Sequence, residues 1–436
     1  MPSSKVVEMS QTTITPNTNL PDFIQADVLI IGAGVVGLAS AYQLSRAGAK
    51  VIVIDKGDPG YGCSYGNAGW ITPCFAMPLP MPGMLLKSIG WLTNPESPLY
   101  IKPEFSMTLF RWLLRFLLSM NRKQMFRSVD ALTAISKQSL DMYKELNATT
   151  EKPFSFEQNG LFMATQTEDG FKYARTEMEL VARNGVPGKL MGEEEARALE
   201  PSLTKRFKGG VFFPEEAHAE PLQVVQMFAH EAQKLGARIF SKAEVIDFQL
   251  GPRGIEGART TRGIFKADQF VLATGSWSPR IGQTLDLRIP VLGGKGYAII
   301  TQPLSPNPTR PLMLVEKKVA VTPRNGTLRL AGTLELVNQD ETFTTRRVEA
   351  IVRGSREFMN VPDPIQYLEI WRGLRPCTPD GVPIIGRTRR FPNLVLATGH
   401  QMLGLQSAPG SGKLVADLTL NRTPDVDPRP FRADRF

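Results

Sequence analysis

The segment "DVLIIGAGVVGLASAYQLSRAGAKVIVIDK", residues 27–56, has the pattern of a strand, a glycine turn, a helix and a second strand that ends on an acid. Residues 28–31 form a continuous apolar run, which is typical of a parallel strand buried on both faces. Gly32, Gly34 and Gly37 follow in the order G-x-G-x-x-G. The first permits a tight turn, the second lets the backbone approach a pyrophosphate, and the third lets the helix pack against the strand. The segment therefore predicts a dinucleotide site, with the phosphates at the helix N-terminus.

The acid at the end of the second strand completes the pattern. The strand "KVIVID" ends at Asp55, roughly 20 residues beyond the glycines, where a carboxylate can accept hydrogen bonds from a ribose hydroxyl. A glycine-rich turn without a ligand is the alternative, but a strand, a helix, a second strand and an acid are all in place. We therefore expect the glycines to bind a dinucleotide together with Val35 and Val36 at the helix start and with Asp55 and Lys56.

Two later segments decide between NAD and FAD. Residues 267–278, "ADQFVLATGSWS", form an apolar strand that runs into Ala-Thr-Gly. Residues 393–418, "NLVLATGHQMLGLQSAPGSGKLVADL", repeat that pattern before a helix that opens near Gly410 or Gly412. A nicotinamide domain is usually one continuous block, whereas here strands from three distant parts of the chain would share one nucleotide sheet. The split favours FAD.

Composition limits the remaining choices. The chain has 436 residues, of which 42% are hydrophobic and 21% charged, so it can bury a large core in two or three folding units. The net charge of +9 would suit an anionic partner, but no block of like charge occurs, and we expect no nucleic-acid partner. Cys63, Cys74 and Cys377 lack C-x-x-C spacing and only three histidines occur, so neither a disulfide framework nor a metal site is indicated.

The N-terminal segment and the hydropathy bear on location. Residues 1–25 are rich in Ser, Thr, Asn and Pro and lack the apolar core of a secretory signal, which predicts a disordered leader. No uncharged apolar run reaches the roughly 18 residues of a membrane-spanning helix. Together with the cysteine usage, this predicts a cytoplasmic protein, either soluble or lying peripherally on the cytoplasmic face of a membrane.

Several motifs occur together in one order: "GAGVVGLASAYQL", "GNAGWITP", "KGYAI", "GLRPCTPDGVPIIGRT", "ATGHQMLGLQSAPGSG" and the closing "PFRADRF". In these the chain resembles the FAD-dependent D-amino-acid oxidase superfamily, most closely the bacterial D-amino-acid dehydrogenases, over about residues 27–436. The resemblance implies FAD, a second domain over the flavin and oxidation of an amino acid at its α-carbon. It also implies an acceptor other than NAD, such as a quinone. Covalent-flavin sarcosine oxidases have a cysteine five residues upstream of the Thr of "TPD"; Gly373 stands there, so we expect non-covalent FAD.

The residues expected to bind FAD follow from the glycine segment and from these motifs. They are Gly32, Gly34, Val35, Val36, Gly37, Asp55, Lys56, Asn67, Ala68, Gly69, Thr274, Gly275, Gly373, Gly399, His400, Gly404 and Leu405. The N-terminus of the helix near Gly410 would stabilise negative charge on the reduced flavin. His400 is expected to pack and bond to the backbone rather than to act directly.

Arg375, in "GLRP", and Tyr297, in "KGYAI", are the candidate catalytic residues. A guanidinium matches a planar carboxylate bidentately and stays charged at any working pH. In the family the arginine of "GLRP" holds the substrate carboxylate, although a structural arginine paired with Asp380 or a carbonyl is the alternative. Tyr297 would donate a hydrogen bond to the same carboxylate, unless it is a buried tyrosine satisfied elsewhere.

The predicted fold class is α/β: a split Rossmann-like FAD-binding domain with an inserted mixed antiparallel α+β substrate domain. Hairpins are expected at Asn159-Gly160, within 154–167, and at Asn325-Gly326, within 318–333; residues 221–240 read as a helix and a strand of the flavin half. After the leader, the predicted division gives FAD-binding parts at 26–95, 206–283 and 371–436, and substrate-domain parts at 96–205 and 284–370.

The segment "MTLFRWLLRFLLSMNR", residues 107–122, carries a narrow basic stripe on an otherwise apolar helix. It predicts contact with a membrane interface or, equally, burial in the substrate domain or at a contact between copies of the chain. The expected function is oxidative deamination of D-amino acids. A D-hydroxyproline dehydrogenase, a glycine/sarcosine-type oxidase and a non-catalytic flavoprotein subunit are the alternatives.

Overall fold

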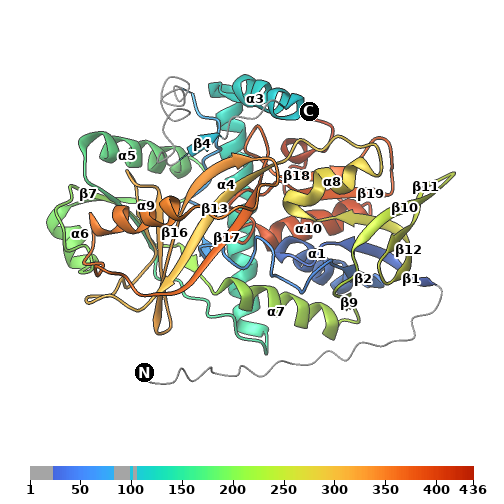
Figure 1. The fold of residues 1–436 in the computed structure, drawn as a ribbon, viewed down its shortest axis with the longest axis horizontal. Coiled ribbons are helices and arrows are strands. Elements are labelled where there is room, and N and C mark those ends of the chain that lie inside the picture. Colours follow the sequence, from blue (N-terminus) through green and yellow to red (C-terminus); the bar gives the residue numbers. More distant parts are fainter. Residues whose placement is uncertain (1–22, 83–98, 102–105) are drawn as a thin grey trace.

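The computed structural model describes residues 23–82, 99–101 and 106–436. The chain forms two lobes, each built around a β-sheet, and the long helix α4 (Arg122–Thr149) passes between them (Figure 1). Ala131, Ile135 and Leu140 of α4 belong to the core of the first lobe, whereas Val129 and Leu132 pack in the second. The helix therefore joins the two cores.

The first sheet has eight strands, and its central strands β9, β2, β1, β12 and β19 run parallel. Its strands are β1 (Phe23–Ile31), β2 (Val51–Ile54), β9 (Arg238–Phe240), β10 (Val245–Gly251), β11 (Gly254–Thr260), β12 (Gly263–Leu272), β18 (Ile384–Arg387) and β19 (Leu394–Thr398). Three distant parts of the chain thus lie side by side, and the predicted split nucleotide sheet is confirmed.

Helices α1 (Val35–Arg46), α7 (Pro221–Lys234) and α10 (Ala408–Thr419) share one core with the first sheet. Glycines let α10 approach its neighbours closely. A Cβ atom at Gly412 would stand 2.6 Å from the carbonyl carbon of Ala39 in α1, and one at Gly410 would stand 2.8 Å from the carbonyl oxygen of Ile135 in α4. The last helix is therefore wedged between α1 and α4.

The second sheet has nine strands in the order β17-β13-β16-β15-β14-β5-β7-β6, with β4 beside β16, and it is mostly antiparallel. These strands are β4 (Leu99–Ile101), β5 (Leu161–Thr165), β6 (Lys189–Gly192), β7 (Gly209–Phe213), β13 (Leu292–Thr301), β14 (Leu312–Leu314), β15 (Val319–Arg324), β16 (Thr327–Val337) and β17 (Tyr367–Cys377). The remaining elements are β3 (Trp70–Ile71), β8 (Ala217–His218), α3 (Met107–Ser119), α5 (Glu168–Ala182), α6 (Glu193–Leu199), α8 (Ser278–Gln283), α9 (Thr345–Arg356), and the 3₁₀ turns η1 (Gly275–Trp277) and η2 (Arg429–Phe431).

The predicted fold class is confirmed, and the two predicted hairpins differ in outcome. Arg324 lies opposite Thr327, so β15 and β16 form the hairpin expected at Asn325-Gly326. The hairpin expected at Asn159-Gly160 is wrong, because β5 pairs antiparallel with β7 and parallel with β14. Both partners are distant in sequence, and a local turn signal cannot reveal them.

Sheet membership also moves several predicted boundaries. Residues 23–25, predicted as the end of the leader, belong to β1 and pair with β12; the rest of the leader and the boundary at 95 lie outside the described residues. The boundary at 206 is too early, because β7 belongs to the second sheet. The boundary at 371 falls inside β17, whose pairing with β13 continues to Cys377.

Helix α3 lies at the edge of the second lobe, beside the C-terminal end of the chain (Figure 1). Its inner face buries Leu109, Trp112 and Phe116 against strands β13 and β16. Its outer face exposes five large apolar side chains: Met107, Phe110, Leu114, Leu117 and Leu118. The expected burial against the second lobe is confirmed for one face, whereas the other face is exposed to solvent and its contact with a membrane stays a prediction. In the described part of the chain, no helix combines the length and apolar character needed to cross a membrane.

Candidate active site

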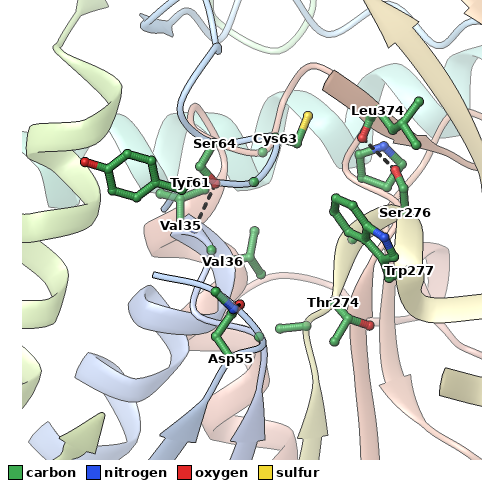
Figure 2. Close-up of a pocket in the computed structure, with 18 of the residues that line it drawn as sticks. Val35, Val36, Asp55, Tyr61, Cys63, Ser64, Thr274, Ser276, Trp277 and Leu374 are labelled. Atoms are coloured by element: carbon green, nitrogen blue, oxygen red, sulfur yellow. Dashed lines mark hydrogen bonds between the residues drawn. The ribbon is translucent and has the colours of Figure 1, made fainter. Parts of the chain in front are cut away.

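A cavity of about 420 Å³ lies between the two lobes, and its walls come from all three segments that carry the predicted nucleotide motifs. Figure 2 shows this cavity, with Val35, Val36 and Asp55 on one side and Thr274, Ser276 and Trp277 on the other. Strand β17 contributes a further wall through Trp371, Gly373 and Leu374. Both sheets thus contribute to the cavity.

The glycine turn after β1 forms one end of the cavity. Gly32 has a φ of +111°, and a Cβ atom there would stand 2.5 Å from the carbonyl oxygen of Ala273. A Cβ atom at Gly37 would stand 1.9 Å from the carbonyl oxygen of Gly32, so that glycine serves the packing of α1 against the turn. Only glycine fits these two positions. Gly34 is the N-cap of α1 and lines the cavity, which leaves the helix N-terminus free to face phosphate.

Asp55 closes the same end of the cavity from β2. Its Oδ2 accepts a hydrogen bond from the Ala33 amide at 2.7 Å, and its Oδ1 accepts one from the Gly57 amide at 2.8 Å. Burial raises the pKa of this carboxyl group, and the two amides offset part of the rise. Each carboxylate oxygen keeps a free lone pair, so the residue can still accept a ribose hydroxyl. The turn, the helix N-terminus and the acid fit the adenosine and pyrophosphate parts of FAD.

Two contacts that the sequence did not suggest brace this part of the wall. The Val35 amide donates to Oγ of Ser64 at 3.1 Å, which joins the start of α1 to the following loop (Figure 2). The Lys56 ammonium lies 4.0 Å from the centre of the Trp277 ring, across the cavity end. Ser64 lies in none of the predicted motifs, and Trp277 lies in the segment 267–278 but was not singled out.

The loops on either side of the cavity are tied together at Asn67. Its Nδ2 donates to the carbonyl oxygen of Met402 at 3.1 Å, and its Oδ1 accepts from the Gly69 amide at 2.8 Å. Arg329 of β16 donates to the Asn67 carbonyl oxygen at 2.6 Å. A single asparagine therefore holds together the loop between β2 and β3, the loop after β19 and the second sheet.

His400 is buried beside α10. Its Nε2 lies 3.1 Å from Oγ of Ser411, and burial lowers its pKa to about 3. The ring therefore stays neutral at ordinary pH. This placement agrees with a packing residue, as the sequence suggested.

Arg375 stands on β17, next to the cavity wall. Its Nη1 donates to the carbonyl oxygen of Thr333 at 2.8 Å, and no Asp or Glu of the described chain forms an ion pair with it. Asp380, the carboxylate considered as its structural partner, instead pairs with Arg435 at 2.7 Å. Burial lowers the pKa of Arg375, and the titratable groups that interact with it are the thiols of Cys63 and Cys377. The guanidinium thus lacks a counter-charge.

Tyr297 lies on the other side of the second sheet. Arg375 is opposite Gly294 and Tyr297 is opposite Arg372, so the side chains of Arg375 and Tyr297 leave opposite faces of the sheet. The Tyr297 hydroxyl accepts a hydrogen bond from the Thr344 amide at 2.9 Å, within an apolar core. The prediction that both residues reach one carboxylate is therefore corrected: the buried alternative describes Tyr297.

The cavity collects most of the residues predicted to bind FAD. Its lining includes Gly32, Gly34, Val35, Val36, Asp55, Lys56, Asn67, Thr274, Gly275, Gly373, His400, Gly404 and Leu405. Four predicted residues, Gly37, Ala68, Gly69 and Gly399, lie outside the lining, as do Arg375 and Tyr297. Lining residues that the sequence did not single out include Cys63, Ser64, Trp277, Glu341 and Trp371.

Comparisons with known proteins agree with this architecture. Residues 27–418 match the family model described as FAD dependent oxidoreductase, and the chain belongs to that family. It is 32% identical over 417 residues to a protein of Vibrio atlanticus named D-amino acid dehydrogenase, covering 94% of this chain and all of that one. A protein of the same name from Bradyrhizobium diazoefficiens is 30% identical over 416 residues, covering 94% of this chain and 98% of that one. The chain is an FAD-dependent oxidoreductase.

Solved structures show the same fold at lower identity. The L-proline dehydrogenase from P. horikoshii superposes with a TM-score of 0.77 and 23% identity, covering 95% of this chain and 98% of that one. The glycine oxidase from Geobacillus kaustophilus gives a TM-score of 0.75 and 22% identity, covering 95% of this chain and 99% of that one.

Proposed function

We propose that this oxidoreductase oxidises D-amino acids at the α-carbon and passes the electrons to an acceptor other than NAD, such as a quinone. Two relatives that cover nearly all of the chain carry the name D-amino acid dehydrogenase. The observation that carries the proposal is Arg375, a guanidinium beside the FAD cavity whose only hydrogen bond within the described residues goes to a carbonyl oxygen.

The surroundings of Arg375 explain why its partner would be a substrate. A partly buried cation without a counter-ion costs free energy, which a carboxylate of the ligand would offset through paired, charge-assisted hydrogen bonds. Cys63 lines the cavity and its thiol interacts electrostatically with the guanidinium, so the guanidinium lies within reach of a carboxylate that enters from the cavity. The carboxylate would then be fixed with the α-carbon toward the cavity.

The remaining residues orient and enclose the reacting atoms. Bound FAD supplies the two-electron acceptor. The protein does not need a nucleophile, because holding the α-carbon at the correct distance lowers the barrier by itself. Asn67 keeps the two cavity loops in register, and the neutral His400 adds no charge near the site.

Anaerobic titration of the purified holoenzyme with D-, L- and N-methyl amino acids would test the proposal. We expect D-amino acids to bleach the flavin absorbance and their L-enantiomers to leave it unchanged. Bleaching by glycine or sarcosine alone would contradict the assignment and favour a different amine as substrate.

We also propose that the enzyme lies peripherally on a membrane through the outer face of α3, where it would meet a quinone acceptor. The face defined by Met107, Phe110, Leu114, Leu117 and Leu118 supports this, because such a cluster of exposed large apolar side chains on one helix usually marks a binding surface.

A further inference from the structure

A second hollow, a groove of about 910 Å³, lies where the end of α3 and the start of α4 meet the C-terminal segment. Four arginines line it: Arg115, Arg127, Arg429 and Arg435. Figure 1 shows the C-terminal end of the chain beside α3. The groove is separate from the FAD cavity, and no residue lines both.

Two of the four arginines of the groove form ion pairs with acids, and the other two have no such pair among the described residues. Arg435 binds Asp380 at 2.7 Å and Arg429 binds Asp427 at 2.9 Å, so these two cations are neutralised. Arg115, in contrast, rests over the Phe436 ring at 5.6 Å. Within the described part of the chain, neither Arg115 nor Arg127 forms an ion pair.

Two further features describe the acids and bases around these arginines. The third acid of the groove, Asp130, accepts a hydrogen bond from Asn184 at 2.9 Å, so part of its acceptor capacity is already used. Residues 106–129 contain five basic side chains and no acid: Arg111, Arg115, Arg122, Lys123 and Arg127. The side of the groove formed by the end of α3 and the start of α4 is therefore basic, and an anion would be drawn to it.

The groove is continuous with the apolar outer face of α3. Leu118 is 70% exposed, belongs to that face and also lines the groove. Val426 and Phe436 add apolar surface to the groove itself. A ligand that fits both parts has an anionic head and an apolar tail.

We propose that this groove binds the phosphate of an anionic phospholipid, with Arg115 and Arg127 as its partners and the acyl chains leaving along the α3 face. The inference rests on the proposed membrane contact and adds a lipid preference to it. Arginine suits this task because its fork of donors matches phosphate oxygens, and the adjoining apolar face would enter the acyl region.

Vesicle sedimentation of the holoenzyme would test the preference. The vesicles would contain phosphatidylcholine alone or phosphatidylcholine with phosphatidylglycerol. We expect Arg115→Gln/Arg127→Gln to lower binding to the anionic vesicles at least about tenfold, and binding to the neutral vesicles to stay unchanged. Arg206→Gln/Arg253→Gln removes the same charge from exposed residues elsewhere and should bind as the wild type does. Turnover with a soluble dye should be the same in all three proteins, which controls for folding.

The remaining outcomes separate the two proposals. Equal losses of binding to anionic vesicles in both double variants would show that the attraction depends on overall charge, and would overturn the proposal of a lipid site in the groove. The wild type and Arg115→Gln/Arg127→Gln could also bind neutral vesicles equally well, with no gain from phosphatidylglycerol. That result would support the membrane contact and reject the lipid site. If sn-glycerol 3-phosphate alone raised the melting temperature through these arginines without vesicle binding, the site would serve a soluble anion, which also overturns the lipid assignment. No vesicle binding by any protein would reject the membrane contact itself.

Discussion

A Cβ atom at Gly296 would stand 1.7 Å from Nη1 of Arg375, so the guanidinium occupies the space that a side chain on the neighbouring strand would fill. The guanidinium of β17 therefore reaches across β13 and bonds to the carbonyl oxygen of Thr333 in β16. Any larger residue at Gly296 would displace the proposed carboxylate partner without touching the FAD cavity directly.

Replacing Arg375 by methionine should isolate carboxylate recognition from cofactor binding. Arg375→Met keeps much of the bulk and removes charge-assisted hydrogen bonds worth roughly 1.5 to 3 kcal/mol, so kcat/KM should fall about ten- to a hundredfold. FAD content should not change, because the residue lies outside the cavity lining. Steady-state kinetics with D-amino acids and with amines that lack the carboxylate would check this. Equal losses for both substrate classes would make Arg375 structural.

The glycine turn offers a matched pair of substitutions. Gly32→Ala should abolish FAD retention and destabilise the protein, because its Cβ would meet the carbonyl oxygen of Ala273 at 2.5 Å. Gly48→Ala also places alanine at a positive φ, of +92°, but its Cβ would meet nothing within 4 Å. The second variant should lose only about 1 kcal/mol of stability and keep its FAD. The absorbance ratio at 450 and 280 nm, with thermal unfolding, would distinguish them; a yellow Gly32→Ala protein would refute the assignment of the turn.

The flavin should leave the protein intact on acid precipitation. Gly373 provides no nucleophile, and burial raises the pKa of Cys63, a thiol in the cavity wall, to about 11. A thiol that stays protonated is a poor nucleophile. We expect FAD in the supernatant, identified by chromatography. Flavin that remained in the pellet would show a covalent bond.

The two faces of α3 should respond differently to polar substitutions. Phe110→Gln with Leu117→Gln changes exposed residues, so the protein should move from membrane to soluble fractions with unchanged dye activity. Trp112→Gln should destabilise the fold by about 3 kcal/mol or more, because the indole is buried and donates to the Cys377 carbonyl oxygen at 3.2 Å. Fractionation and urea unfolding would measure both. Unfolding of the first variant would show that the outer face also belongs to the core.

Glu216 should make stability depend on pH between about 4.5 and 8. Burial raises its pKa from 4.5 to about 8, while the Cys74 amide donates to its Oε1 at 3.1 Å. Between these pH values the folded protein holds a proton that the unfolded chain has lost. The contribution of Glu216 is therefore complete below pH 4.5 and is lost as pH rises to 8, by about 1.4 kcal/mol per pH unit. Urea unfolding at pH 5.5 and 7 should show this decrease in the wild type and not in Glu216→Gln. Identical slopes would contradict the assignment.

The sequence predicted correctly those features that depend only on residues close together along the chain. The glycine turn, the helix α1 and Asp55 form one local unit, and their spacing reveals their purpose before any partner is known. The β15–β16 hairpin was also predicted correctly, because its two strands and the turn between them are consecutive in the sequence.

The errors arose where a partner is distant. β5 finds its neighbours in β7 and β14, so the turn signal at Asn159-Gly160 was misleading. The position of Tyr297 depends on which face of β13 it occupies, and that strand is buried along its whole length, so its burial pattern does not distinguish the faces. Ser64 lies in no predicted motif and reaches the cavity only through the fold.

The division of the nucleotide sheet among three parts of the chain sets an order of events during synthesis. A ribosome completes β1, the glycine turn and α1 long before it reaches β19 and the wedged helix α10. At about 5 to 20 residues per second, the interval is roughly 20 to 70 seconds. During that time the nascent chain carries half of a binding site, with apolar strands that lack their neighbours. The cavity wall is complete only when residues 397–405 have been added. Cofactor supply would therefore affect finished chains, whereas chaperones would protect the unfinished ones.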